Sequence, residues 1–68
     1  MAYLRIIAHF EDSNYKKYKI AEVFDGGLTS KYWNVLYENG NIFLPNYKSY
    51  DGAKRGLERE VGKIWELS

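Results

Sequence analysis

The chain has 68 residues, which is enough for one small domain, residues 1–68, and no more. It contains no cysteine, which excludes disulfides and thiolate metal sites, and its single histidine, His9, excludes a histidine-rich metal site. The formal net charge of +1 is too small to indicate a protein devoted to wrapping nucleic acid or to lying on an anionic membrane.

No apolar run in the sequence approaches the roughly 18 residues that a membrane span needs. The first residues lead directly into an alternating pattern and lack the basic start and cleavage site of a signal peptide. We therefore expect a soluble, unprocessed protein. The absence of cysteine suits a reducing compartment, so we expect a cytoplasmic location.

Residues 3–10 alternate in the way of a β-strand, and a polar turn cluster at residues 11–14 follows them. One side of this strand carries Leu4, Ile6, Ala8 and Phe10, and the other carries Tyr3, Arg5, Ile7 and His9. Because the first set is the more apolar, we expect it to face the core and the second set to lie on the open side of a sheet.

Residues 15–24 form the second predicted strand, which ends at an Asp-Gly-Gly turn. Its facing is ambiguous, because one phase points Tyr18, Ile20 and Phe24 inward together with Glu22, whereas the other draws Lys19 toward the core. A bulge in this strand would reconcile the two patterns. The link at residues 25–30 has the length of a loose hairpin loop or a short crossover.

Residues 31–45 are predicted to form a β-hairpin around Asn39-Gly40, because a type I′ turn needs positive φ at both central residues and this pair tolerates it. The two-residue turn places Leu36 opposite Phe43, and Pro45, which lacks an N–H, ends the strand. One face then carries Trp33, Val35, Tyr37, Ile42 and Leu44, and the other carries Tyr32, Asn34, Leu36 and Phe43. Both faces are apolar, which is unusual in a half-buried sheet.

A C-terminal helix is predicted from Ser49, a good N-cap, with Asp51 in the first turn where its charge suits the helix dipole. Its apolar face is formed by Tyr50, Ala53, Leu57, Val61, Ile64 and Trp65, which recur at helical spacing. Gly52, Gly56 and Gly62 each cost about 1 kcal/mol in a helix interior. We interpret them as sites of close packing on the sheet, with close approach of a partner backbone as the alternative.

These elements predict an α+β fold of order ββββα, in which an antiparallel four-stranded sheet carries one C-terminal helix packed on one face. The helix is expected to cover the side of the hairpin that carries Trp33, Val35 and Leu44, with Leu57, Val61 and Trp65 buried against it. The opposite face of the sheet stays open.

Nothing in the sequence predicts catalysis, so we expect a protein that is not an enzyme and uses no cofactor. His9 lies near no nucleophile in the sequence, and the serines and threonines occupy turn, cap or loop positions. The carboxylate pairs Glu11-Asp12 and Glu58/Glu60 are interpreted as solvated surface. No metal site is predicted, because the Asp-Gly-Gly turn lacks the further ligand positions of a calcium loop.

The leading hypothesis is a macromolecule-binding module that docks a protein partner, or a second copy of itself, through the open sheet face. Tyrosine-rich surfaces with an arginine and few lysines are typical of protein interface cores. The predicted partner-binding residues are Tyr3, Arg5, Ile7, Tyr32, Leu36 and Phe43.

The alternative hypothesis is nucleic-acid binding, because residues 15–19 interleave aromatic rings, which stack on bases, with lysines, which meet phosphates. The residues assigned to this DNA or RNA site are Tyr15, Lys17, Tyr18 and Lys19 on the strand and Arg55, Arg59 and Lys63 on the helix. Lysines that protect an edge strand give the same pattern without any ligand. Glu58, Glu60 and Glu66 dilute the positive field of the helix.

In architecture, a small antiparallel sheet followed by a C-terminal helix resembles the sheet-reading DNA-binding domains of the plant AP2 type and the arm-binding modules of integrases. Arginine and tryptophan on the strands contact DNA in those families, whereas tyrosine, asparagine, leucine and phenylalanine stand here, so the resemblance assigns no functional residues. The short, aromatic-rich, cysteine-free profile is also similar to that of small phage or mobile-element accessory proteins, which implies an inhibitor that binds a host enzyme.

Overall fold

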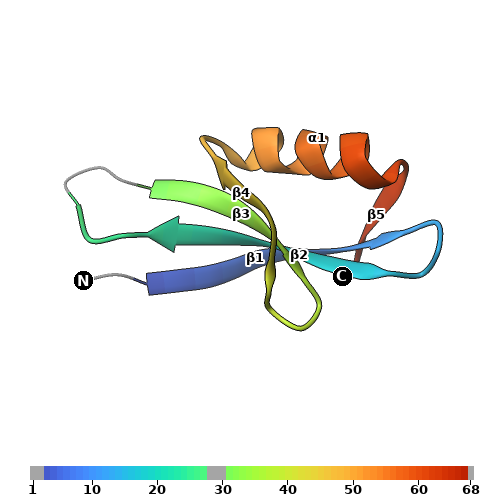
Figure 1. Cartoon of the computed structure of the whole chain (residues 1–68), viewed down its shortest axis with the longest axis horizontal. Coiled ribbons are helices and arrows are strands. Elements are labelled where there is room, and N and C mark those ends of the chain that lie inside the picture. Colours follow the sequence, from blue (N-terminus) through green and yellow to red (C-terminus); the bar gives the residue numbers. More distant parts are fainter. Residues whose placement is uncertain (1–2, 28–30, 68) are drawn as a thin grey trace.

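The computed structural model describes residues 3–27 and 31–67. Its elements are β1 (Tyr3–Asp12), β2 (Lys17–Phe24), β3 (Lys31–Tyr37), β4 (Ile42–Tyr47), α1 (Tyr50–Val61) and β5 (Ile64–Leu67). The strands form one antiparallel five-stranded sheet in the order β4-β3-β2-β1-β5, and α1 lies over one face of it (Figure 1). The predicted α+β fold is therefore confirmed, with a fifth strand that the sequence did not predict.

The helix begins where the sequence predicts it, because the Gly52 N–H donates to Ser49 Oγ at 2.9 Å and caps the first turn. It ends at Val61, earlier than predicted. Gly62 adopts a φ of 85° and donates its N–H to the Glu58 carbonyl, a backbone conformation that turns the chain out of the helix. The chain then forms β5, which pairs with β1 from His9 to Asp12, so the expectation that Trp65 packs beneath the helix is wrong.

The core lies between α1 and the sheet. Ala53 and Leu57 of the helix are fully buried and pack in one cluster with side chains from the three central strands. The sheet residues of this cluster are Ala8, Phe10, Tyr18, Ile20 and Val35. Each large side chain buried here contributes about 1.5–3 kcal/mol to stability, so a chain of this size depends on few residues.

A β-bulge in β1 reverses the facing of the strand halfway along it. Ile6 lies opposite Ala21 and Ala8 lies opposite Ile20, so Ile7 is an extra residue on β1. Tyr3 and Arg5 consequently share the helix side of the sheet with Ala8 and Phe10, while Leu4 and Ile6 lie on the opposite side. The continuous alternation predicted for residues 3–10 is wrong, because one inserted residue shifts the phase.

The facing of β2 follows the phase that carries Glu22 to the helix side with Tyr18 and Ile20. Its antiparallel pairing with β3 shows that the two strands form a hairpin and that no crossover joins them. The predicted loop at residues 25–30 lies partly outside the described residues. In its described part, the Gly27 N–H donates to Asp25 Oδ1 at 2.9 Å.

The β3–β4 hairpin has a three-residue loop, not the predicted two-residue turn. The Tyr37 N–H donates to the Asn41 carbonyl at 2.8 Å, the Gly40 N–H donates to the Tyr37 carbonyl at 2.9 Å, and within the loop only Gly40 has positive φ. Leu36 therefore lies opposite Ile42 instead of Phe43. Phe43 moves to the helix side, where its ring centroid is 4.7 Å from that of Tyr37.

Strand β4 is irregular and forms one edge of the sheet. Its pairing with β3 shifts on both sides of Leu44, and Asn46 adopts a φ of 63° while its N–H donates to Asn34 Oδ1 at 2.8 Å. The strand continues past Pro45, so the prediction that this proline ends it is wrong. A missing N–H is tolerated there because an edge strand and a bulge leave backbone groups unpaired.

Gly56 allows α1 to pack closely on β4. A Cβ atom built on Gly56 would overlap the phenol ring of Tyr47, so only glycine fits at this position without movement of the ring. The close-packing interpretation of the helix glycines therefore holds for Gly56, whereas Gly62 serves to end the helix.

Candidate functional site

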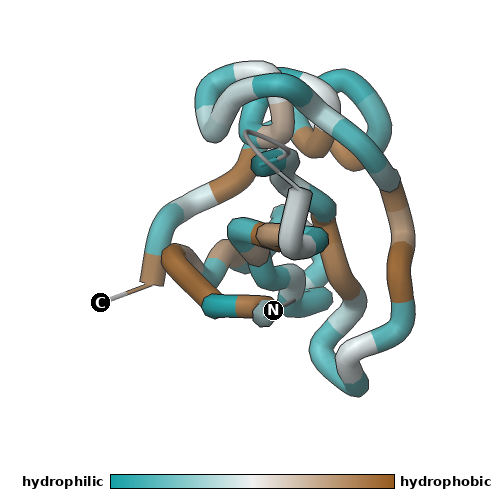
Figure 2. Tube along the Cα trace, turned by 90° about the vertical axis from the view of Figure 1, so that its left-hand side faces the viewer, coloured by the Kyte–Doolittle hydropathy of each residue, from teal (hydrophilic) through white to brown (hydrophobic). Residues whose placement is uncertain are grey.

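The side of the sheet opposite α1, which we call the outer face, carries no second layer in the described part of the chain (Figure 2). Cross-strand register assigns its residues, because directly opposite side chains share a face. Leu4, Val23 and Tyr32 form one row across β1, β2 and β3, and Ile6, Ala21 and Asn34 form the next. We call Leu4, Ile6, Val23 and Tyr32 the outer patch.

Leu4 and Ile6 are the most exposed members of the outer patch. Leu4 is 54% exposed, and Ile6 and the bulge residue Ile7 are 37% and 36% exposed. Single exposed apolar residues are common on protein surfaces, whereas these side chains lie together at one corner of the sheet.

The outer patch borders an open sheet edge. Strand β1 pairs with β2 from Tyr3 to Glu11, but β5 pairs with β1 only from His9 to Asp12. Among the described residues, no strand pairs with residues 3–7 on this side of β1, and all five of these residues are exposed. Their outward N–H and C=O groups therefore form a template on which another strand can add.

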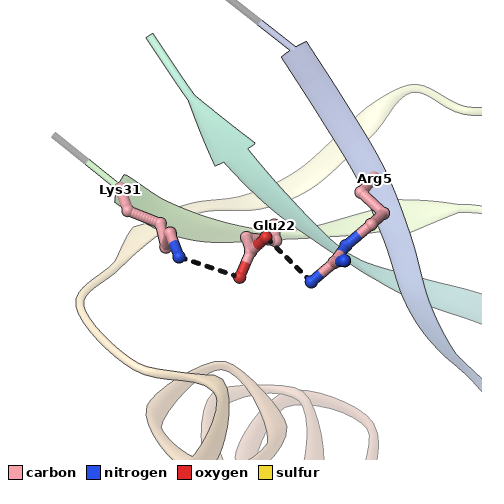
Figure 3. Close-up of polar contacts among 3 residues, drawn as sticks. All are labelled: Arg5, Glu22 and Lys31. Atoms are coloured by element: carbon pink, nitrogen blue, oxygen red, sulfur yellow. Dashed lines mark ion pairs between the residues drawn. The ribbon is translucent and has the colours of Figure 1, made fainter. Parts of the chain in front are cut away.

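Glu22 is buried on the helix side of this corner and lies between two cations (Figure 3). Its Oε1 is 3.1 Å from Arg5 Nη2, and its Oε2 is 3.6 Å from Lys31 Nζ. A buried carboxylate is costly unless it is paired, and here strands on both sides supply the partners. Arg5 therefore has a carboxylate partner within the chain, which it shares with Lys31. Beside it, the rings of Tyr3 and Phe24 stack with centroids 5.3 Å apart.

The predicted partner-binding residues do not form one surface. Tyr32 and Leu36 lie on the outer face as expected, but Leu36 is buried between its cross-strand neighbours Lys19 and Ile42. Three of the predicted residues lie on the helix side, which corrects the predicted facing: Tyr3, Arg5 and Phe43. Ile7 is the exposed extra residue of the bulge.

Leu4 and Ile6 were missed because they alternate in step with Ala8 and Phe10, which are core residues. The signal that could have revealed them is the adjacent apolar pair Ile6-Ile7, since two neighbouring apolar residues break a strict in-and-out pattern and are typical of a bulge. The bulge that would reconcile the two phases of β2 does not occur opposite β3, because β2 pairs with β3 without a register shift.

The β1–β2 hairpin has the same loop geometry as the β3–β4 hairpin. The Asp12 N–H donates to the Lys16 carbonyl at 3.0 Å, and the Tyr15 N–H donates to the Asp12 carbonyl at 3.1 Å. Tyr15 thus occupies the position that Gly40 holds in the other loop, and it has a φ of 65°. Its side chain is 82% exposed. An exposed aromatic residue in a left-handed conformation costs about 1–2 kcal/mol of backbone strain.

The Asp12 carboxylate holds this loop together. Its Oδ1 accepts the N–H groups of Asn14 at 2.8 Å and Lys16 at 2.9 Å, and its Oδ2 accepts the Tyr18 hydroxyl at 3.1 Å. Desolvation by burial acts to raise the pKa of Asp12, but the two N–H groups and the hydroxyl outweigh it, so the pKa lies below its ordinary value. Burial and the bond to Asp12 raise the pKa of Tyr18.

A groove of about 470 Å³ lies between the tips of the two hairpins. Its lining combines aromatic, basic and polar residues: Tyr15, Lys16, Lys17, Tyr37, Glu38 and Asn39. Lys16 Nζ lies 5.2 Å from the centroid of the Tyr37 ring, a cation–π distance, so one lysine of the groove is already engaged. We call this feature the hairpin groove.

The residues predicted to bind nucleic acid are divided between several surfaces. Tyr15 and Lys17 line the hairpin groove, but Tyr18 is buried and Lys19 lies on the outer face. Arg55 and Arg59 of α1 line a separate groove of about 320 Å³, together with Glu60 of the same helix and Tyr47 of β4. Lys63 Nζ lies 5.3 Å from the Trp65 ring centroid.

No group of three or more His, Cys, Asp or Glu side chains in the described ranges is placed to hold a metal ion. No helix in those ranges has the length and apolarity needed to cross a membrane. Comparison with known proteins finds no protein-family model, no curated protein and no solved structure that matches the chain.

Proposed function

We propose that the protein is a non-enzymatic binding module that docks another protein through the outer patch and the open edge of β1. The observation that carries the proposal is that exposed apolar side chains and unpaired backbone groups coincide on residues 3–7. A partner that covers them gains about 25 cal/mol per Å² of apolar surface buried. It also gains the backbone hydrogen bonds of an added strand.

Site-specific photo-crosslinking in the native cells tests this proposal. A photoreactive phenylalanine analogue replaces Leu4 in one variant and Ile42 in a matched control, since Ile42 is an equally exposed apolar residue (58%) of the outer face but belongs to the opposite edge strand. We expect a discrete adduct, identified by mass spectrometry, from position 4 alone.

The purified adduct partner must then bind the wild-type chain and lose affinity for the Ile6→Lys variant, because a lysine in the outer patch places a charge in the apolar interface. Absence of any adduct at position 4, or equal adducts at both positions, would overturn the proposal. Circular dichroism verifies that each variant is folded.

Single-stranded nucleic-acid binding in the hairpin groove is the second candidate function. The observation that favours it is the exposed, strained Tyr15 beside Lys16 and Lys17, because an unstacked ring next to ammonium groups suits a base and its phosphate. A residue kept in a costly conformation is a reason to suspect a function.

Fluorescence anisotropy with a labelled oligothymidylate tests this second function. We expect affinity that falls with salt and weakens in Tyr15→Ala and Lys17→Ala. The matched control is Arg55→Ala, which removes a basic residue from the separate groove on α1. No binding at low salt, or equal losses in all three variants, rejects the hairpin groove as a nucleic-acid site.

A further inference from the structure

The β4 edge of the sheet and the open edge of β1 differ in how well they resist the addition of another strand. The β4 edge contains two register shifts, a proline without an N–H and a residue with positive φ, Asn46. These features bend and interrupt the row of backbone groups, and natural sheets use them to prevent edge-to-edge association. Strand β4 is therefore a poor template for a further strand.

The open edge of β1 lacks this protection along residues 3–6, which pair with β2 without a register shift. Its one charged side chain is Arg5, and a charge at an edge normally discourages pairing. Here Glu22 holds the Arg5 guanidinium at 3.1 Å, on the helix side and away from the outer patch. The edge is thus regular and apolar on its outer face, and its one charged side chain is paired with a carboxylate on the helix side.

We propose that the strand added to this edge belongs to a second copy of the chain, so that two β1 strands pair antiparallel about a twofold axis and the two sheets become continuous. This inference rests on the proposed function, since it names the protein that docks on the outer patch. The formal net charge of +1 opposes the approach of two copies only weakly.

Side-chain chemistry selects the register of this pair. Directly opposite residues must share a face, so the twofold axis passes through a residue that faces itself. An axis at Arg5 places two guanidinium groups opposite each other, which is destabilising. An axis at Leu4 instead places Leu4 against Leu4 on the outer face and Arg5 against the exposed ring of Tyr3 on the helix side. A cation over an aromatic ring is a favourable pair.

Strand β5 limits the registers in which two β1 strands can pair. It occupies the same edge of β1 from His9 onward, so a second copy can pair only with the segment before that residue. The bulge at Ile7 interrupts the regular backbone within this segment. The axis at Leu4 pairs residues 3–5 of the two copies, which lie on the regular part of β1 and clear of both features.

Disulfide trapping tests the register, because the natural chain contains no cysteine. Under mild oxidation of the purified protein, Leu4→Cys should form a covalent dimer rapidly, since opposite residues in an antiparallel pair have Cα atoms about 4.5–5.5 Å apart, within disulfide range. Ile6→Cys is the matched control on the same strand and face. In this register the two residues at position 6 would lie about 13 Å apart, which is too far for a disulfide, so the Ile6→Cys variant should form no covalent dimer.

Sedimentation equilibrium of the wild-type chain supplies the non-covalent measurement. We expect a monomer–dimer equilibrium whose dissociation constant rises about tenfold or more in Leu4→Lys, since two lysines then face each other. Ile42→Lys, on the opposite edge, should leave the constant unchanged. Faster trapping of Ile6→Cys than of Leu4→Cys, or a wild-type monomer at all concentrations, overturns the proposal.

The outcomes also separate this inference from the proposed function. If the wild-type chain is monomeric and Leu4→Cys is not trapped, but the crosslinker at position 4 captures a different identified protein, the second copy is wrong and the docking surface stands. If position 4 captures nothing and the chain is monomeric, both proposals fail.

Discussion

Tyr15 and Gly40 hold the same position in two hairpin loops with the same backbone hydrogen bonds, yet one is tyrosine and the other is glycine. Both residues have positive φ, where a β-carbon is unfavourable. The ring of Tyr15 points into solvent, so little packing offsets the strain. Stability alone does not explain this tyrosine.

We predict that Tyr15→Gly stabilises the protein by about 0.5–1 kcal/mol, because relief of backbone strain exceeds the entropy that glycine adds to the unfolded chain. For a domain of this size, 1 kcal/mol shifts the thermal midpoint by about 4–8 °C. Calorimetry measures the change. The control is Asn14→Gly, which lies outside the positive-φ position and should gain nothing. A lower midpoint for Tyr15→Gly contradicts the prediction.

The Asp12 carboxylate makes stability depend on acid pH. Its pKa is lowered in the folded chain, so the ionised group stabilises the fold above its unfolded value of about 4 and loses this effect as the pH falls through the lowered value. We predict that Asp12→Asn is less stable at neutral pH but loses less stability between about pH 5 and pH 2. Urea unfolding at successive pH values measures both effects.

Tyr18→Phe serves as the partial control for this prediction, because it removes the hydroxyl donor to Asp12 and leaves the two N–H donors in place. We expect a pH dependence between those of the wild type and Asp12→Asn. Parallel curves for all three proteins would show that Asp12 is not a source of the acid sensitivity.

At the scale of elements, the close contact between α1 and β4 depends on the lack of a side chain at Gly56. We predict that Gly56→Ala destabilises the protein by about 1–3 kcal/mol through overlap with Tyr47, although alanine improves helix propensity by about 1 kcal/mol. Urea unfolding measures the loss. Gly56→Ala combined with Tyr47→Leu should recover part of it, because the smaller side chain makes room.

The control for this pair is Arg55→Ala on the exposed side of the helix, where we expect a change within about 0.5 kcal/mol. If Gly56→Ala is as stable as the wild type, the ring of Tyr47 moves without cost. If the double variant shows the sum of the two single losses, the two positions are not coupled.

Local signals in the sequence predicted several elements well. Ser49 as N-cap and Asp51 in the first turn identify the start of α1, because capping depends on neighbouring residues alone. The end of the helix was predicted too late, since Ile64 and Trp65 continue the helical spacing after Gly62. Only pairing with β1 reveals these residues as a strand, and pairing with a distant segment leaves no local signal.

Bulges account for most of the errors in side-chain facing. A shift of one residue moves all following side chains to the other face of the sheet. The extra residue Ile7 therefore puts the two halves of β1 in opposite phase, whereas the sequence predicted one continuous alternation. The Asn39-Gly40 pair located its hairpin correctly but fits both a two-residue and a three-residue loop, and the choice between them decided the face of Phe43.

At the scale of the whole molecule, the sequence correctly predicted an antiparallel sheet with one helix packed on one face. That prediction followed from the alternation of the strands and the helical spacing of residues 50–61. The exposed residues on that face could not be predicted from periodicity, because their identity depends on the bulge in β1 and on where β5 stops. A surface defined by the end of a strand distant in sequence leaves no signal in the local pattern.

Self-association would also make thermal stability depend on protein concentration, because dimer formation stabilises the folded state by mass action. We predict that the midpoint of the wild-type chain rises with concentration, whereas that of Leu4→Lys stays constant once it is monomeric. Differential scanning fluorimetry over a hundredfold concentration range measures this. A constant midpoint for the wild-type chain, under conditions where sedimentation detects a dimer, contradicts the prediction.

If the chain self-associates through β1, the irregular β4 strand would limit the size of the assembly. A sheet that can pair with another strand at both edges can form an open fibre, whereas a sheet that can pair at one edge alone forms a closed dimer. If two copies join at β1, the joined sheet ends in the two β4 strands, where Pro45 and Asn46 interrupt the row of backbone groups, and the β5 strands, which also lie at an edge, are four residues long. An irregular β4 edge and a short β5 edge would then favour a finite pair over a fibre.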